Sequence, residues 1–348
     1  MTIRAGGCPQ ILKKLVQTNS LELPGYCEDS LCEEAGCLIL GKAGLSRESA
    51  EVFWAASGTM ANLSVLTTVL SANEAVLAAD TAHIHTAEAG AIEFSAHKIL
   101  TVSGKNGKIL PEKIEEVCTP YEESDPVSRA HICRPKAVYI SFPTELGTLY
   151  SLEELRALSG VCKRHRLFLY IDGARLAYGL AASSDVGLKE IAEYADAFYI
   201  GGTKCGALFG EAVVIKDPDV RERYLGVLRM CGGLVAKGRA LGCSFKAFFT
   251  DDLYLSLGEE GNEKAAKIRD AFETIGVRFH SESPTNQLFP IVDEKLFRLL
   301  SKQIKFKVIG RTQEGLRILR LCTSWSTPDE AVEALVNLIK SDKNNECP

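Results

Sequence analysis

Residues 197–207 have the sequence AFYIGGTKCGA, an apolar run followed by two glycines and one lysine. A short apolar, aromatic and β-branched run is typical of a strand covered on both faces. Gly201 and Gly202 allow a sharp turn and a close approach of the backbone to a ligand. Lys204 then follows the carboxyl end of the strand, where desolvation lowers the pKa of an amine and makes it a good Schiff-base nucleophile. Taken alone, the stretch also fits a solvated lysine on a glycine-rich loop.

The alternation of strand and helix extends on both sides of this stretch, from about residue 50 to 215. Apolar runs predict strands at residues 51–56, 75–79, 97–102, 135–141, 167–171, 197–200 and 211–215. Helical segments between them predict an α/β fold, with a mostly parallel seven-stranded sheet covered by helices on both faces. In such sheets ligands bind beyond the carboxyl ends of the strands.

Chain length, net charge and cysteine spacing limit the class of protein. A chain of 348 residues suits two lobes, and we expect an N-terminal arm over 1–30, a large domain over 31–248 and a smaller C-terminal α/β domain over 249–348. A net charge of −5 argues against a nucleic-acid partner, and no apolar run is long enough for a membrane span. The amino terminus lacks a signal peptide, and the twelve cysteines show no metal or disulfide spacing. We therefore expect a cytoplasmic protein with reduced thiols and no metal.

Polar side chains follow the predicted strands at their carboxyl ends. They are Ser57, Gly58, Thr59, His83, Glu145, Asp172, Arg175, Thr203 and Lys204. The turn at Ser57–Thr59 opens a helix, so its free amides and hydroxyls suit an anion such as phosphate; simple N-capping by Ser57 or Thr59 is the alternative. Core packing does not require charged groups at all of these strand ends, which favours a ligand site.

His83, His85 and Glu88 lie close together in the sequence AHIHTAEAG. A metal site is disfavoured, because side chains two residues apart face opposite ways on a strand and diverge on a helix. Packing of the His83 ring against an aromatic ligand fits better, and an uninvolved capping histidine is the third interpretation.

A lysine, an aspartate, an anion turn and a flat histidine together match pyridoxal 5′-phosphate (PLP). Lys204 would bond the cofactor, Asp172 would keep its pyridine nitrogen protonated, and His83 would stack on its ring. An NAD site would need Gly-x-Gly-x-x-Gly where this chain has SGTMAN, and a P-loop is absent.

Several motifs resemble the threonine aldolase and β-eliminating lyase family of fold-type I PLP enzymes. They are ASGTMANL, AHIHTAEAG, IDGARLA, the Lys204 turn and, in the C-terminal lobe, NQLFP and LRLCTSWST. The resemblance covers the chain from about residue 25 onward. It implies a homodimer or homotetramer with shared active sites, Lys204 as the PLP lysine and Gly58 and Thr59 on the phosphate. It also implies that Arg175 and Arg320 bind the α-carboxylate of an amino-acid substrate, as suits guanidinium.

The chain departs from the family pattern at three places. At the amino terminus, Met1-Thr2-Ile3-Arg4 does not match the Ser-Asp or Asn-Asp pair with which the family opens. Glu145 stands where the family has a histidine after the strand, so we expect a carboxylate there to handle the proton of the substrate hydroxyl. Lys237 stands in a loop where the family has Arg-Gln-Ala-Gly, and we expect it to reach the phosphate of a neighbouring subunit.

Three functions compete at this point. The first is an aldolase that cleaves L-threonine, L-allo-threonine or a related β-hydroxy-α-amino acid, with Glu145, or a water that it holds, as the base and Glu88 as the second choice. The alternative is a β-eliminating lyase in which Lys204 removes the Cα proton. The third, a protein that only stores PLP, leaves the lysine, aspartate and arginines unexplained.

Overall fold

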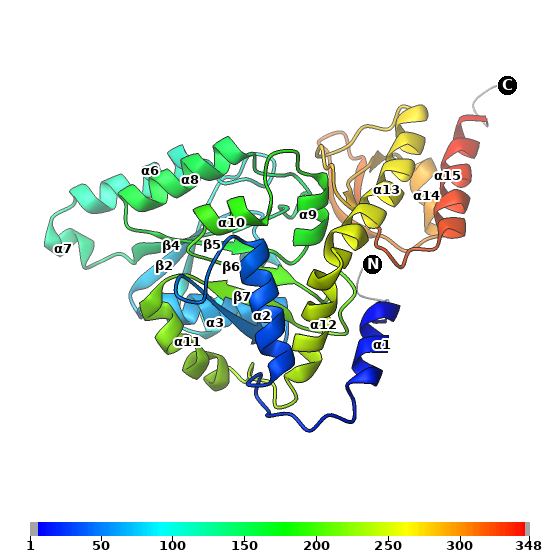
Figure 1. Ribbon diagram of the computed structural model, residues 1–348. Coiled ribbons are helices and arrows are strands. Elements are labelled where there is room, and N and C mark those ends of the chain that lie inside the picture. Colours follow the sequence, from blue (N-terminus) through cyan, green and yellow to red (C-terminus); the bar gives the residue numbers. More distant parts are fainter. Residues whose placement is uncertain (1–5, 345–348) are drawn as a thin grey trace.

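The computed structural model describes residues 6–344, so residues 1–5 of the expected arm lie outside the described residues. Its centre is a seven-stranded sheet in the order β1-β7-β6-β5-β4-β2-β3 (Figure 1). The strands are β1 (Glu51–Ala55), β2 (Glu74–Ala79), β3 (Lys98–Val102), β4 (Arg134–Ser141), β5 (Phe168–Asp172), β6 (Ala197–Gly201) and β7 (Glu211–Ile215). Only β7 runs against its neighbours, β1 and β6. The predicted mostly parallel seven-stranded sheet is confirmed.

Helices cover both faces of this sheet. The helices are α1 (Pro9–Gln17), α2 (Ser30–Lys42), α3 (Gly58–Val69), α4 (His83–Thr86), α5 (Ala91–Phe94), α6 (Pro111–Glu123), α7 (Pro126–Arg129), α8 (Leu152–Arg164), α9 (Leu176–Ala182), α10 (Leu188–Tyr194), α11 (Pro218–Met230), α12 (Arg239–Thr250), α13 (Leu253–Thr274), α14 (Glu294–Ser301) and α15 (Asp329–Asn344). One apolar cluster joins α3 and α11 to one face, and another joins α2, α8, α9, α10 and α12 to the other. Burial on both faces explains why the strand sequences are nearly continuous apolar runs.

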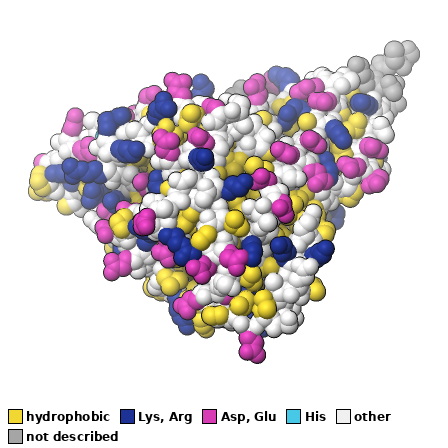
Figure 2. All heavy atoms as spheres, in the orientation of Figure 1, with side chains coloured by type: hydrophobic (Ala, Val, Ile, Leu, Met, Phe, Trp, Pro, Cys, Tyr) yellow, Lys and Arg dark blue, Asp and Glu magenta, His cyan; other side chains and the backbone are white. Residues whose placement is uncertain are grey.

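Local sequence signals set where the helices begin. The Ser57 hydroxyl accepts a hydrogen bond from the Met60 amide at the start of α3, and Ser151 and Glu154 form the predicted capping box of α8. Among the described residues, no helix has the length and apolar character that a bilayer span requires. Basic and acidic side chains are interspersed on the face shown in Figure 2.

A smaller antiparallel sheet follows the long helix α13. Its strands are β8 (Gln287–Leu288), β9 (Ile291–Val292), β10 (Lys307–Arg311) and β11 (Arg317–Cys322). Strands β8, β9 and β11 share an apolar cluster with α13, α14 and α15. The sequence Val277-Arg278-Phe279 also predicts a strand, but this prediction is wrong, since Phe279 forms only an isolated bridge, with Pro290. The expected division into arm, large domain and small domain stays a prediction.

Candidate active site

A cavity of about 350 Å³ lies at the carboxyl ends of β1, β4, β5 and β6. Except for Lys237, the site residues predicted from the sequence all line it: Ser57, Gly58, Thr59, His83, Glu88, Glu145, Asp172, Arg175, Thr203, Lys204 and Arg320. These residues come from segments far apart in the chain. The sheet order brings them together, because parallel strands end at the same edge.

Glycines allow the two turns that carry Asp172 and Lys204 to pack backbone against backbone. The Gly201 amide donates to the Gly173 carbonyl over 3.0 Å. A Cβ atom on Gly173 would lie 1.8 Å from the carbonyl oxygen of Tyr199, which is far inside contact distance. No residue with a side chain fits at Gly173, and this close contact brings Lys204 near Asp172.

Lys204 faces the cavity from the turn after β6. Burial lowers the pKa of its amine, and the neighbouring guanidinium of Arg175 lowers that pKa further. The negative charge of Asp172 raises the pKa of Lys204. The Tyr178 hydroxyl donates to the Lys204 backbone carbonyl over 2.8 Å and so fixes the turn. The lysine thus has the depressed pKa that the sequence predicted for a Schiff-base nucleophile.

Asp172 is buried at the end of β5 and is surrounded by donors. Its Oδ1 accepts from the Tyr199 hydroxyl (2.6 Å) and the Ala174 amide (2.9 Å). Its Oδ2 accepts from the Tyr139 hydroxyl (2.6 Å) and from Asn62 Nδ2 (3.0 Å). Burial alone would raise the pKa of Asp172, but Lys204 and these hydrogen bonds outweigh it, and the pKa is lowered. Asp172 is therefore a fixed anion.

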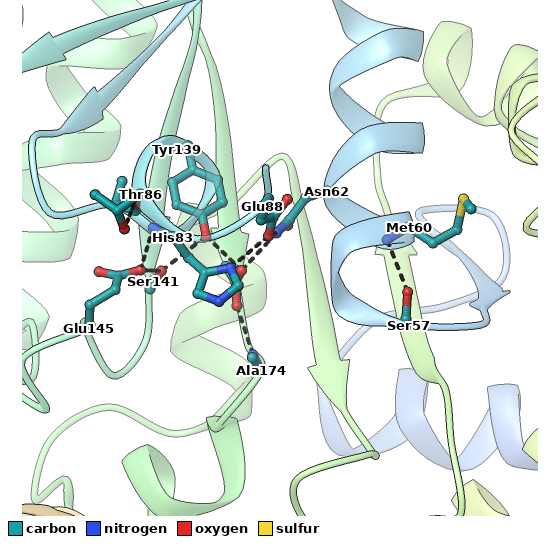
Figure 3. A network of polar contacts seen from close by, with 12 residues as sticks. Ser57, Met60, Asn62, His83, Thr86, Glu88, Tyr139, Ser141, Glu145 and Ala174 are labelled. Carbon is teal, nitrogen blue, oxygen red and sulfur yellow. Dashed lines mark hydrogen bonds and ion pairs between the residues drawn. The ribbon is translucent and has the colours of Figure 1, made fainter. Parts of the chain in front are cut away.

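Asn62 connects Asp172 to Glu88 and, through it, to His83; Figure 3 shows Asn62, Glu88 and His83 close together. Asn62 Nδ2 also donates to Glu88 Oε1 over 2.7 Å, and the same oxygen lies 2.7 Å from His83 Nδ1. The Tyr170 hydroxyl donates to Asn62 Oδ1 over 3.1 Å. Glu88 orients the His83 ring and uses one oxygen to do so. His85 is exposed and lies outside the cavity.

Glu145 follows β4 and approaches His83 from the side opposite Glu88 (Figure 3). Its Oε1 accepts from the His83 amide (3.0 Å) and from the Ser141 hydroxyl (2.6 Å). No hydrogen bond from the described residues reaches Oε2. Desolvation raises the pKa of Glu145, the Ser141 hydrogen bond lowers it, and the negative charge of Asp172 raises it again. The net raised pKa brings this carboxyl toward the range of a general base at neutral pH.

Arg175 and Arg320 form a pair of cations at the side of the cavity that faces β11. Each has a buried Nε that finds no partner among the described residues. Arg320 donates through Nη2 to Gln287 Oε1. Burial lowers the pKa of Arg320, and the charge of Arg175 lowers it further. Two neighbouring guanidinium groups with unused donors suit an anionic ligand such as a carboxylate.

Several polar residues of this site were not predicted from the sequence, among them Asn62, Tyr139, Ser141, Thr144, Tyr199 and Glu211. Tyr139 and Tyr199 lie within apolar strands, where tyrosine is indistinguishable from an ordinary core residue. The sequence shows Glu211 as an acidic residue at the start of the apolar run EAVVI. In the sheet, Glu211 pairs with Gly201 and therefore lies beside the turn that carries Lys204. Lys237 is exposed, precedes α12 and does not line the cavity. Its role stays a prediction.

Comparison with known proteins agrees with this arrangement. A family model described as beta-eliminating lyase matches residues 43–295. The low specificity L-threonine aldolase of Pseudomonas aeruginosa is 28% identical, over 97% of this chain and 95% of that protein.

Solved structures are similar over nearly the whole chain. The threonine aldolase of Leishmania major has a TM-score of 0.93 and 35% sequence identity, covering 98% of both chains. Cystalysin from Treponema denticola, whose structure contains a PLP cofactor, has a TM-score of 0.72 at 14% identity and covers 99% of this chain and 89% of its own. These likenesses confirm the predicted fold-type I architecture.

Proposed function

Because the chain belongs to the beta-eliminating lyase family, we propose that it is a PLP-dependent aldolase. It cleaves L-threonine, L-allo-threonine or a related β-hydroxy-α-amino acid to glycine and an aldehyde. The observation that supports this most is the convergence of Lys204, Asp172 and the Arg175–Arg320 pair in one cavity. Relatives named as low specificity L-threonine aldolases support the same reaction.

The residues of the cavity fit PLP. Lys204 has the lowered pKa that bonding to an aldehyde requires, and Asp172 is an anion suited to a pyridinium nitrogen. Gly58 leaves room beside the Tyr199 hydroxyl, which would lie 2.9 Å from a Cβ atom there. We assign the phosphate to Ser57, Gly58, Thr59 and Thr203, and the ring face to His83. Bound PLP supplies an electron sink that stabilises the carbanion at Cα.

Arg175 and Arg320 bind the α-carboxylate of the substrate in this proposal. Their unpartnered Nε groups are donors that a carboxylate would satisfy. A planar bidentate pair fixes the rotation of the amino acid, so that the bond to be broken has one orientation. The depressed pKa of Lys204, next to these cations, keeps the amine available as a nucleophile.

Glu145 is the proposed base that removes the proton of the β-hydroxyl, directly or through a water that it holds. Its Oε2 receives no hydrogen bond from the described residues, and its pKa is raised by desolvation. Glu88 is a weaker candidate, because its side chain is fully buried and orients the His83 ring. The backbone hydrogen bond from His83 to Glu145 keeps the base beside the ring that stacks on the cofactor.

The proposal includes a homodimer or homotetramer in which Lys237 reaches the phosphate of a neighbouring subunit. Exposed apolar side chains in and after α1, in the turn after β6 and at the end of α11 support an interface: Leu12, Val16, Leu21, Leu208 and Met230. The proposal also includes a cytoplasmic location, in which cysteines stay reduced. Sedimentation of the purified protein, which measures its mass in solution, tests the assembly.

A product assay with PLP and L-threonine tests the reaction. Acetaldehyde together with glycine is the expected result. 2-Oxobutyrate together with ammonia would contradict the aldolase and assign the protein to β-elimination, with Lys204 as the Cα base. Absence of both product pairs with threonine and with allo-threonine, but turnover of a bulkier β-hydroxy amino acid, would keep the reaction and change the substrate.

A further inference from the structure

Glu211 is a buried acid of the cavity that the proposed reaction does not use. It opens β7, pairs in register with Gly201 and is 4% exposed. It lines the same cavity as the Ser57–Thr59 turn. A Cβ atom on Gly58 would lie 4.0 Å from Glu211 Oε1. The carboxyl therefore lies close to the turn assigned to the cofactor phosphate.

The contacts of Glu211 hold it in place without neutralising it. Oε2 accepts from the Gly202 amide over 2.7 Å, and Oε1 accepts from the Thr203 hydroxyl over 2.9 Å. It forms no ion pair with the described residues, although Lys204 lies near enough to lower its pKa. Burial outweighs that charge and both hydrogen bonds, and raises the pKa of Glu211 to about 7. A buried carboxylate without a paired cation is costly, so protonation relieves a real penalty.

The other titratable groups that face Glu211 do not change this conclusion. Asp172, at the end of β5, is anionic and raises the pKa of Glu211 further. Burial raises the pKa values of Tyr170, Tyr199 and Tyr254 well above 10, so these hydroxyls stay neutral. Burial likewise raises the pKa of the Cys205 thiol to about 12. Lys204 is the cation whose charge lowers the pKa of Glu211.

We propose that Glu211 is a ligand of the cofactor phosphate and binds it in its protonated form. This inference rests on the proposed function. A phosphate ester carries close to two negative charges at neutral pH, and a second anion beside it in a protein interior is strongly repelled. Once protonated, the carboxyl becomes a hydrogen-bond donor to a phosphate oxygen, while its other oxygen keeps the Gly202 amide. The proton comes from solvent, so each cofactor bound takes up one proton wherever the empty site is ionised.

The inference gives a definite pH dependence. Below pH 7 the carboxyl of the empty site is already protonated, and it adds no pH dependence to binding. Above pH 7 the carboxyl must first take up a proton, so the affinity falls by up to about tenfold for each further pH unit. The Glu211→Gln side chain resembles the protonated acid in shape and in its ability to donate a hydrogen bond. The affinity of this variant for the cofactor should therefore not fall above pH 7.

The test measures binding rather than turnover, with 4′-deoxypyridoxine 5′-phosphate as the probe. This probe carries the ring and phosphate but has no aldehyde, so Lys204 cannot bond to it. Titration calorimetry at about pH 8, in two buffers of different ionisation enthalpy, counts the protons taken up on binding. The wild type should take up close to one proton more than Glu211→Gln, and Glu211→Gln should bind about tenfold more tightly. At about pH 6 the two should bind alike.

Matched variants identify the group. Glu145→Gln removes a second carboxyl of the cavity whose pKa is raised, and it should keep the full proton uptake. Glu211→Asp keeps an ionisable group and should keep a fall of affinity with pH, which provides a test if Glu211→Gln does not fold. Equal proton uptake in the wild type and Glu211→Gln would overturn the inference. No binding of the probe to the wild type would instead overturn the proposed cofactor site.

Discussion

Asp172 and Glu145 are two carboxyls of one cavity whose pKa values move in opposite directions. Asp172 is the more deeply buried, yet its pKa is lowered, because four donors and Lys204 stabilise the charge. Glu145 has two donors, both on one oxygen, and desolvation raises its pKa. The comparison teaches that the number of donors and the nearest cation, more than burial, decide which carboxyl stays ionised. Opposite shifts suit opposite roles, a permanent anion and a proton acceptor.

The largest effect is expected from Lys204, which lines the same cavity as both carboxyls. Lys204→Ala should reduce turnover below detection, because no other amine lines the cavity in the described residues. Absorbance spectra with PLP should lack the lysine-linked chromophore of the wild type. Lys189→Ala, at an exposed position on α10 that does not line the cavity, is the control and should keep that chromophore. Full turnover by Lys204→Ala would remove the basis of the proposed site.

Asp172→Ala tests the permanent anion. Removing a preorganised charge from a buried site costs about 10²- to 10³-fold in kcat, and we expect the upper end because the Tyr139 and Tyr199 hydroxyls also lose their acceptor. Steady-state kinetics measure the loss, and PLP titration should show weaker binding of the cofactor. Unchanged turnover would contradict the assignment of Asp172 to the pyridinium.

Glu145→Gln tests the proton acceptor, with an expected loss of about 10²-fold in kcat, typical of a general base. The base must be ionised to act, so wild-type kcat should fall as the pH drops through the raised pKa of Glu145. The variant should lose this acid limb. Ser141→Ala removes a hydrogen bond that lowers that pKa, so its acid limb should move to higher pH. A limb that stays in place in both variants would assign the proton to another group.

Tyr199→Phe should give the smallest effect. It measures how much the hydrogen bond from the Tyr199 hydroxyl to Asp172 contributes to stability. Loss of a hydrogen bond to a charged group should lower the free energy of unfolding by about 1.5–3 kcal/mol. Tyr224→Phe is the matched control, since its buried hydroxyl lies 2.9 Å from the neutral Ser64 hydroxyl, and it should cost about 1 kcal/mol. Urea unfolding of the two variants compares them. Equal losses would mean that Asp172 gains no special stabilisation from Tyr199.

Strand ends were the predictable part of the site. Ser57, Asp172 and Lys204 each follow an apolar run, and parallel strands must bring such positions to one edge. Asn62, Tyr139 and Tyr199 were not predictable, because their partners lie on other strands and helices and depend on the sheet order. The strands of the smaller sheet were harder to predict from the sequence. Its edge strand β10 is mostly exposed, so it lacks the apolar pattern that marks a strand.

The sequence by itself determined the α/β fold, the polar residues at the strand ends and the lysine turn. Those features depend on hydrophobic periodicity and on turn residues that are neighbours in the chain. Only the tertiary structure decided which carboxyl is a fixed anion and which is suited to accept a proton. It also decided that Glu211 lies close to the turn at Gly58. A pKa depends on donors, charges and desolvation within a few ångströms, and here these come from residues more than a hundred positions apart, such as Asn62 and Asp172.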